Sequence, residues 1–271
     1  MNARIVKDTA AEYHAVKALS NSGISKLLQA PAHFKAWRDG ADKETEALIF
    51  GRMFHNLTLE PELFDAAYGV YDRPGNTTKG RAQAKAIREA GQHPVKAADF
   101  AAAQAMATSA RSNPFMGRLL ECAIHREISI YWEEEHEGIV FPCKARLDII
   151  SEVPDYGALV CDLKSAASAH PDDMPKAIFT YGYHRQAPWY MRACREVGVD
   201  ALAFALLAVE KEPPYLTLAG TISEAAMCQG LAEIRSAVGT YVDCMRTNTW
   251  PGYPVEVQEL DLPEWAYRKA V

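Results

Sequence analysis

Two aspartates and one lysine lie in short apolar segments of this sequence, where charged side chains are unusual. Asp148 lies within segment 146–150. Asp162 and Lys164 lie within segment 159–164. Burying a charge is costly unless an opposite charge or a metal ion lies against it. Because carboxylate oxygens are the ligands that Mg²⁺ and Mn²⁺ prefer, the pattern indicates a divalent metal site.

If both segments are β-strands, their side chains alternate between the two faces of a sheet. Asp162 and Lys164 then project to one face, while Leu163 turns into the core. Gly157 follows a Pro-Asp-Tyr turn sequence, which predicts an antiparallel hairpin with Asp148 beside Asp162. Two carboxylates and an ammonium group at one point predict phosphodiester hydrolysis.

Composition predicts a soluble, cytoplasmic globular protein. The chain has 271 residues, of which 49% are hydrophobic, enough for one large α/β domain. No apolar run approaches the roughly 20 residues of a membrane span, and the N-terminus lacks a signal peptide's apolar stretch. Six cysteines without C-x-x-C spacing predict buried thiols in a reducing compartment. The net charge of −6 still permits DNA binding, because basic residues can be confined to one groove.

We expect a single nuclease domain, residues 1–271, with three parts. Residues 1–120 form a mainly helical part that carries His55, residues 121–222 form a β-rich catalytic core, and residues 223–271 form a C-terminal helix and tail. The order of strands and helices predicts an α/β (α+β) fold with a central mixed sheet flanked by helices.

Local patterns predict where several elements begin and end. We expect helices capped by Ser20 or Ser22, starting at Pro31, and running from Glu44 to Leu59 and from Ser223 to about Thr247. A strand should span 126–132, followed by a turn over 133–138. Residues 74–81 should form a loop ahead of a helix over 82–88. Pro188 predicts a helix that restarts near Arg185.

Two candidate ligands come from other parts of the chain. His55 lies in a helical row with Ala47, Gly51 and Leu59, whose small members allow a neighbouring element to approach. A histidine on an apolar face is commonly a hydrogen-bonded core residue, but beside carboxylates a neutral imidazole is also a metal ligand. Glu127, on the strand before the hairpin, can reach the same cluster or remain a surface acid.

The most basic segment of the chain lies between residues 73 and 88. Its cations could hold a phosphate backbone, or they could form an ordinary solvated face. The candidate DNA-binding residues in this segment are Lys79, Arg81, Lys85 and Arg88.

Five elements arrive in a fixed order along the chain. They are G-x-x-x-H (Gly51, His55), Glu127, R-x-D (Arg146, Asp148), D-L-K (Asp162 to Lys164) and Q-x-x-x-Y (Gln186, Tyr190). This order resembles the RecB-type branch of the PD-(D/E)XK nuclease superfamily, and more narrowly the RecE-like exonucleases of prophages, also called exodeoxyribonuclease VIII. The resemblance covers Leu19 to Ala266 and includes the closing Leu262-Pro-Glu-Trp-Ala266.

The resemblance implies a metal centre that holds Mg²⁺ or Mn²⁺, with two ions per site. Its ligands would be His55, Asp148, Asp162 and the backbone carbonyl of Leu163.

The resemblance also implies roles for four further residues. Lys164 would activate the attacking water, Gln186 and Tyr190 would position DNA near the metals, and Glu127 would join the catalytic residues. Pro188 departs from the family pattern, which does not require it.

The activity implied is a Mg²⁺-dependent exonuclease that degrades one strand of linear double-stranded DNA from the 5′ end. Its product would be a 3′ single-stranded overhang for a strand-annealing protein of the RecT type. Family members form rings that thread DNA, so a homo-oligomer such as a tetramer is expected.

Two other functions are open. A Cas4-like or endonucleolytic enzyme would act on single strands or flaps, although Cas4-type proteins group their cysteines for an iron–sulfur cluster and this chain does not. An inactive DNA-binding scaffold would predict loss of Asp148, Asp162 or Lys164, and all three are present.

Overall fold

The computed structural model describes residues 3–41, 45–73, 75–263 and 267. At its centre lies a six-stranded sheet in the order β1-β4-β5-β6-β7-β8. The strands are β1 (Arg4–Val6), β4 (Ala123–His136), β5 (Ile139–Val153), β6 (Gly157–Ala166), β7 (Ala201–Glu210) and β8 (Thr217–Thr221). Neighbouring strands are antiparallel except β6 and β7, which are parallel. The predicted α/β fold with a central mixed sheet is confirmed.

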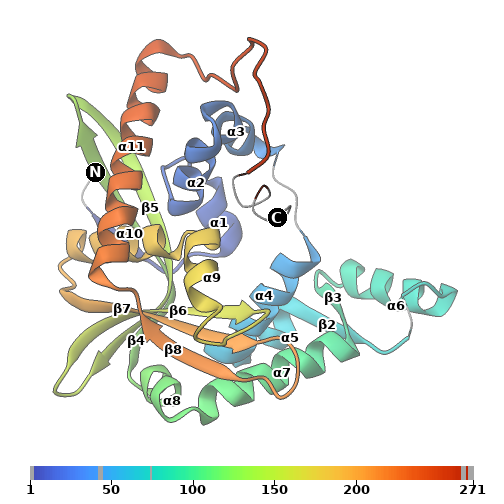
Figure 1. Ribbon diagram of the computed structural model, residues 1–271. Helices are drawn as coiled ribbons and strands as arrows, with labels where there is room; N and C mark the ends of the chain where they lie inside the picture. Colours follow the sequence, from blue (N-terminus) through green and yellow to red (C-terminus); the bar gives the residue numbers. More distant parts are fainter. Residues whose placement is uncertain (1–2, 42–44, 74, 264–266, 268–271) are drawn as a thin grey trace.

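Helices cover both faces of the sheet and bury a hydrophobic core against each (Figure 1). One face packs against α4 (Glu46–Leu59), α7 (Ala97–Ser112) and α8 (Pro114–Glu121). The other packs against α2 (Asn21–Gln29), α3 (Pro31–Ala36), α10 (Tyr183–Glu196) and α11 (Glu224–Thr247). Shorter helices are α1 (Ala10–Ala15), α5 (Phe64–Ala67), α9 (Met174–Tyr181), the π-helix Trp37–Ala41 and the 3₁₀-helix Pro61–Leu63. No described helix combines the length and apolar character needed to cross a membrane.

Local sequence signals explain how the first helices begin and end. The Ser20 hydroxyl accepts from the Gly23 N–H and caps α2, and Pro31 begins α3 as predicted. Thr45 caps α4, which ends at Leu59 before Glu60-Pro61. Glu44, the predicted first residue of α4, and the motif residues Trp265 and Ala266 lie outside the described residues.

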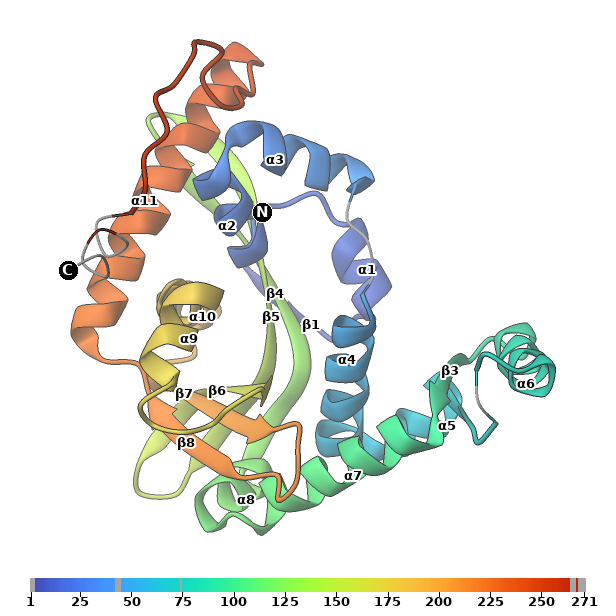
Figure 2. The ribbon, with the colours of Figure 1, turned by 45° about the vertical axis from the view of Figure 1, so that its right-hand side comes forward.

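An arm made of β2 (Tyr68–Tyr71), α6 (Thr78–Glu89) and β3 (His93–Lys96) projects from the body of the molecule beside α7 (Figure 2). Its strands pair in parallel. The predicted loop up to Arg81 was wrong, because the Thr77 hydroxyl accepts from the Gly80 N–H at 3.0 Å and starts α6 at Thr78. The part predicted as mainly helical therefore also contains short strands, which are too brief to show periodicity.

The predicted turn over 133–138 was too long. Strand β4 continues to His136, and only Glu137 and Gly138 connect it to β5. Both have positive φ, at 49° and 76°, as a tight two-residue hairpin requires.

The helix that carries Gln186 begins at Tyr183, two residues before Arg185, so the predicted restart near Arg185 is confirmed. Gly182, with φ 72°, separates α9 from α10. Pro188 lies inside α10 and cannot donate to the His184 carbonyl four residues earlier. Gly230 of α11 packs against this carbonyl so closely that an added Cβ would lie 2.0 Å from its oxygen. The carbonyl that Pro188 leaves without its helical donor is therefore the one against which α11 packs.

Gly230→Ala should destabilise the protein by about 1–3 kcal/mol, because the new methyl group would force α11 away from rigid backbone atoms of α10. Thermal unfolding followed by circular dichroism tests this. Gly239→Ala is the matched control in the same helix, since its Cβ would meet only His136 Nε2 at 3.8 Å. Removing a helical glycine there should add about 0.5–1 kcal/mol of stability. Equal melting temperatures for the two variants would contradict the proposed close approach.

Candidate metal and catalytic site

Strand pairing places three carboxylates side by side across the sheet. The register of β4 with β5 puts Glu127 opposite Asp148. The β5 and β6 pairing ends at Ile149 and Cys161, and one further step in the same register puts Asp162 opposite Asp148. The β5–β6 hairpin forms as predicted.

Helix α4 delivers His55 to these carboxylates. His55 Nε2 lies 2.7 Å from the Leu163 carbonyl oxygen, and Nδ1 lies 3.4 Å from Glu127 Oε1 and 3.7 Å from Asp148 Oδ1. The Leu163 N–H donates to Asp148 Oδ2 at 2.8 Å. Within the described part of the chain, His55, Glu127 and Asp148 form a group whose potential ligand atoms all lie within 4.8 Å of one another.

Asp162 is held from two directions. Gln186 Nε2 donates to Asp162 Oδ1 at 2.7 Å, and Lys164 Nζ lies 2.6 Å from Oδ2. Despite this contact, buried Oδ2 accepts no well-directed hydrogen bond from any described residue. The Asp162 carboxylate therefore retains an oxygen able to bind a further positive group.

The electrostatics of the cluster favour positive charge. Burial raises the pKa of Asp148 to about 7. Burial alone would lower the pKa of His55, but Asp148 and Glu127 raise it to about 9. Burial likewise opposes charge on Lys164, yet Asp162 and Asp148 raise its pKa above the ordinary value. The cluster thus stabilises cations.

The donor set suits Mg²⁺ or Mn²⁺. Carboxylates from three strands, the Leu163 carbonyl and the His55 imidazole are ligand types that these ions accept. Asp162 Oδ2 is buried beside Lys164 and could supply a further oxygen ligand. The structure places His55, Asp148 and the Leu163 carbonyl together, with Asp162 beside Asp148 across the sheet. It also brings Glu127, which the sequence left open as a cluster member or a surface acid, to His55.

Glu127 occupies the cluster rather than the surface. Its φ of 47° is uncommon for a residue other than glycine and is typical of functional sites. Arg146 Nε donates to Glu127 Oε2 at 3.2 Å, and its NH1 donates to Asp8 Oδ1 at 3.1 Å. Burial opposes the charge on Glu127, but His55 and Arg146 lower its pKa.

Asp8 is a residue that sequence reasoning missed. It follows β1, whose pairing with β4 carries it to Arg146, and it also accepts from Ser129 Oγ and the Tyr131 hydroxyl, each at 2.5 Å. Nothing in the local sequence marks it, because its partners lie more than a hundred positions away along the chain. Asp8 fixes Arg146, which in turn fixes Glu127.

Gln186 and Tyr190 face the site from α10, but not as open DNA ligands. Gln186 is only 7% exposed, and its side-chain amide donates a hydrogen bond to Asp162. Burial raises the pKa of the Tyr190 phenol well above its ordinary value, so this group stays neutral. Their contact with DNA remains a prediction, whereas Gln186 has a clear role in holding Asp162.

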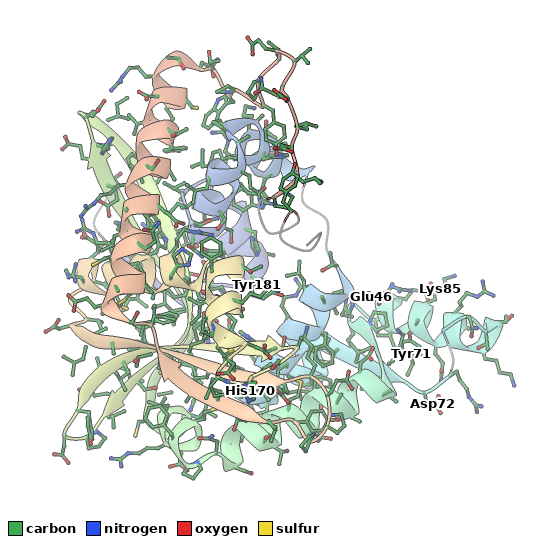
Figure 3. The ribbon with its side chains drawn as sticks, in the orientation of Figure 1. Glu46, Tyr71, Asp72, Lys85, His170 and Tyr181 are labelled. Atoms are coloured by element: carbon green, nitrogen blue, oxygen red, sulfur yellow. The ribbon has the colours of Figure 1, made fainter. Side chains whose placement is uncertain are left out.

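The predicted basic residues lie on the arm, apart from the metal cluster. Figure 3 shows Lys85 on α6 at the outer end of the molecule, whereas Tyr181 lies on the body. Arg81, Lys85 and Arg88 are exposed and recur at helical spacing on one side of α6. Lys79 points to the other side of this helix, because it precedes Arg81 by only two residues.

Comparison with known proteins identifies the family to which the chain belongs. The model of a family described as "PDDEXK-like domain of unknown function (DUF3799)" matches residues 20–262. A search of curated proteins finds no match.

Two solved structures also resemble the chain. One, from Eubacterium rectale, is described as a "putative exonuclease"; it has a TM-score of 0.62 and 13% identity, with 98% of this chain and 100% of that chain covered. This likeness shows a shared fold. A second, described as SSO0001, has a TM-score of 0.29 and 16% identity over 48% of this chain and 52% of its own, too little to indicate a shared fold.

Proposed function

The chain belongs to the PDDEXK-like domain family, within the PD-(D/E)XK nuclease superfamily, and from this membership we propose a Mg²⁺- or Mn²⁺-dependent exodeoxyribonuclease. The observation that supports it most is the convergence of His55, Asp148 and Asp162 with Lys164, from one helix and two paired strands. A carboxylate and imidazole cluster beside a lysine suits hydrolysis of a phosphodiester.

Each residue has a role that follows from its contacts. His55, Glu127, Asp148, Asp162 and the Leu163 carbonyl would hold the ions, of which we propose two. When bound, these ions would neutralise charge on the phosphate and increase the acidity of water.

Lys164 acts as a hydrogen-bond donor in this scheme. Its Nζ lies 2.6 Å from Asp162 Oδ2, where it can donate to the attacking water or to a phosphate oxygen. Gln186 keeps the Asp162 carboxylate in place.

The finer parts of the proposal rest on resemblance to the RecE-like exonucleases. The enzyme would degrade linear duplex DNA from 5′ to 3′ and leave 3′ single-stranded overhangs for an annealing protein of the RecT type. It would assemble as a homo-oligomeric ring, such as a tetramer. A cytoplasmic location follows from these partners.

The arm would contact the DNA backbone through Arg81, Lys85 and Arg88. Replacing all three with glutamine should weaken binding of duplex DNA and reduce the slope of log K against log salt by about 2–3, since each lost phosphate contact removes about 0.9. Fluorescence anisotropy in Ca²⁺, over a salt series, measures this slope. Lys79→Gln removes one charge from the other side of α6 and should leave the slope unchanged. An unchanged slope in the triple variant would remove the arm from the DNA-binding surface.

Cleavage of linear duplex DNA labelled separately at each 5′ and 3′ end tests the proposed activity. Early release of the 5′ label, only with Mg²⁺ or Mn²⁺ and with a closed circle left intact, is the expected result. Nicking of the circle would favour the endonuclease. Failure to cleave any DNA with either metal would overturn the proposed function.

A further inference from the structure

Two tyrosines flank the glycine that separates α9 from α10. The Gly182 N–H donates to the carbonyls of Ile178 and Phe179 and ends α9, and the φ of 72° at Gly182 turns the chain into α10. This turn leaves Tyr181 largely in solvent, with 66% of its surface exposed, while Tyr183 is half-buried. The turn thus presents one aromatic ring outside the protein and one inside.

These rings form a continuous row with the catalytic lysine. Lys164 Nζ lies over the Tyr183 ring at 5.3 Å from its centroid. The rings of Tyr183 and Tyr181 are 5.7 Å apart between centroids, with an interplanar angle of 30°. Figure 3 shows Tyr181 on the body of the molecule, at the end of α9. The row therefore leads from the reacting end of Lys164 to the surface.

Tyr183 links the exposed ring of Tyr181 to the charged groups of the site. Tyr183 is close enough to Lys164 and Asp162 for both to affect its pKa, which burial raises. A substrate whose phosphate lay at Lys164 would therefore bring its neighbouring groups against these rings. In a nucleic acid, the neighbouring flat group is a base. Aromatic side chains bind bases of any sequence by stacking, because every base has a π-face.

We propose that Tyr181 and Tyr183 form a stacking site for a nucleobase of the strand that is being cleaved. This inference rests on the proposed nuclease function and adds a substrate-binding element to it. The site would hold a base next to the scissile phosphate and so present that phosphate to Lys164. It would act on DNA of any sequence, and it would require the base rather than the sugar or phosphate.

Tyr181→Ala should raise the KM for linear duplex DNA by about 5- to 100-fold, the range for loss of one stacked base, while Tyr181→Phe should stay within about twofold of wild type. Phe179→Ala is the matched control, because Phe179 is 70% exposed on the same helix but stacks on His184 instead of the row.

Substrates with one abasic nucleotide, placed in turn at each of the first few positions from the cleaved end, separate stacking from a structural role. At one abasic position, the activity of wild type should fall by the same factor that Tyr181→Ala causes on normal DNA. The activity of Tyr181→Ala itself should not fall further on that abasic substrate. Quenching of 2-aminopurine at the same position, measured in Ca²⁺, should require Tyr181.

The outcomes distinguish this site from the function on which it rests. The stacking site would be overturned, and the nuclease left intact, if Tyr181→Ala cleaved normal DNA as well as wild type does. It would also be overturned if the substitution reduced activity by the same factor on normal and on abasic DNA. Absence of metal-dependent DNA cleavage by the wild-type protein would overturn both.

Discussion

Asp162→Asn should reduce DNA cleavage by about 10³-fold or more while DNA binding stays within about twofold of wild type. The amide keeps the shape of the carboxylate and still accepts a hydrogen bond from Gln186, so the fold should persist. It removes the negative charge beside Lys164 and one oxygen ligand for the ions. Single-turnover cleavage of end-labelled duplex measures the rate, and anisotropy in Ca²⁺ measures the affinity.

Asp172→Asn provides the matched control for this change. The Asp172 side chain is 91% exposed, and its Oδ2 lies 3.7 Å from His170 Nδ1, so its neutralisation should leave cleavage unchanged. An Asp162→Asn enzyme with more than about a tenth of wild-type activity would show that the metal site has been assigned to the wrong residue.

Lys164→Met is expected to lower the single-turnover rate by about 10²- to 10³-fold, comparable to the loss of one preorganised donor to a developing oxyanion. Methionine fills a similar volume against the Tyr183 ring but cannot donate to a water or a phosphate oxygen. The affinity for Mn²⁺, measured by calorimetry, should not fall, because Lys164 binds no metal in this account.

Lys176→Met tests whether loss of any nearby lysine has the same effect. Lys176 is exposed on α9, and its replacement should leave the rate within about twofold of wild type. If Lys164→Met kept the wild-type rate, the water-orienting role of Lys164 would have to be abandoned.

The parts of the site that sequence predicted are those fixed by short-range patterns. Alternation along two strands and a Pro-Asp-Tyr-Gly turn are enough to place Asp148 beside Asp162. The 3.6-residue period of α4 is enough to put His55 in one row with Gly51 and Leu59, and the structure leaves His55 partly exposed at the edge of the packed face formed by Met53, Phe54 and Leu57. In both cases neighbouring residues determine the geometry, so no knowledge of distant contacts is needed.

The parts that sequence did not predict depend on contacts between distant segments. Asp8 reaches Arg146 only because β1 joins the sheet edge beside β4. Gln186 donates to Asp162 from α10, and α10 itself packs closely against Gly230 of α11 through the His184 carbonyl, a contact between segments far apart in the sequence.

Errors of a local kind arose where two signals competed. Gly80 and the preceding turn residues suggested a loop, but the Thr77 cap dominates and begins α6 earlier. No local sequence pattern encodes where the arm lies relative to the body. The sequence therefore identified the basic segment but could not show that it lies apart from the metal cluster.

The metal centre itself is tested most directly by crystals of the protein grown with Mn²⁺ and measured for anomalous scattering. We predict a difference peak at coordination distance, about 2 Å, from Asp148, the Leu163 carbonyl and His55 Nε2, with His55 no longer donating to that carbonyl. The proposed metal centre would be contradicted if, at a saturating concentration of Mn²⁺, His55 Nε2 still donated to the Leu163 carbonyl and the anomalous signal lay at other residues.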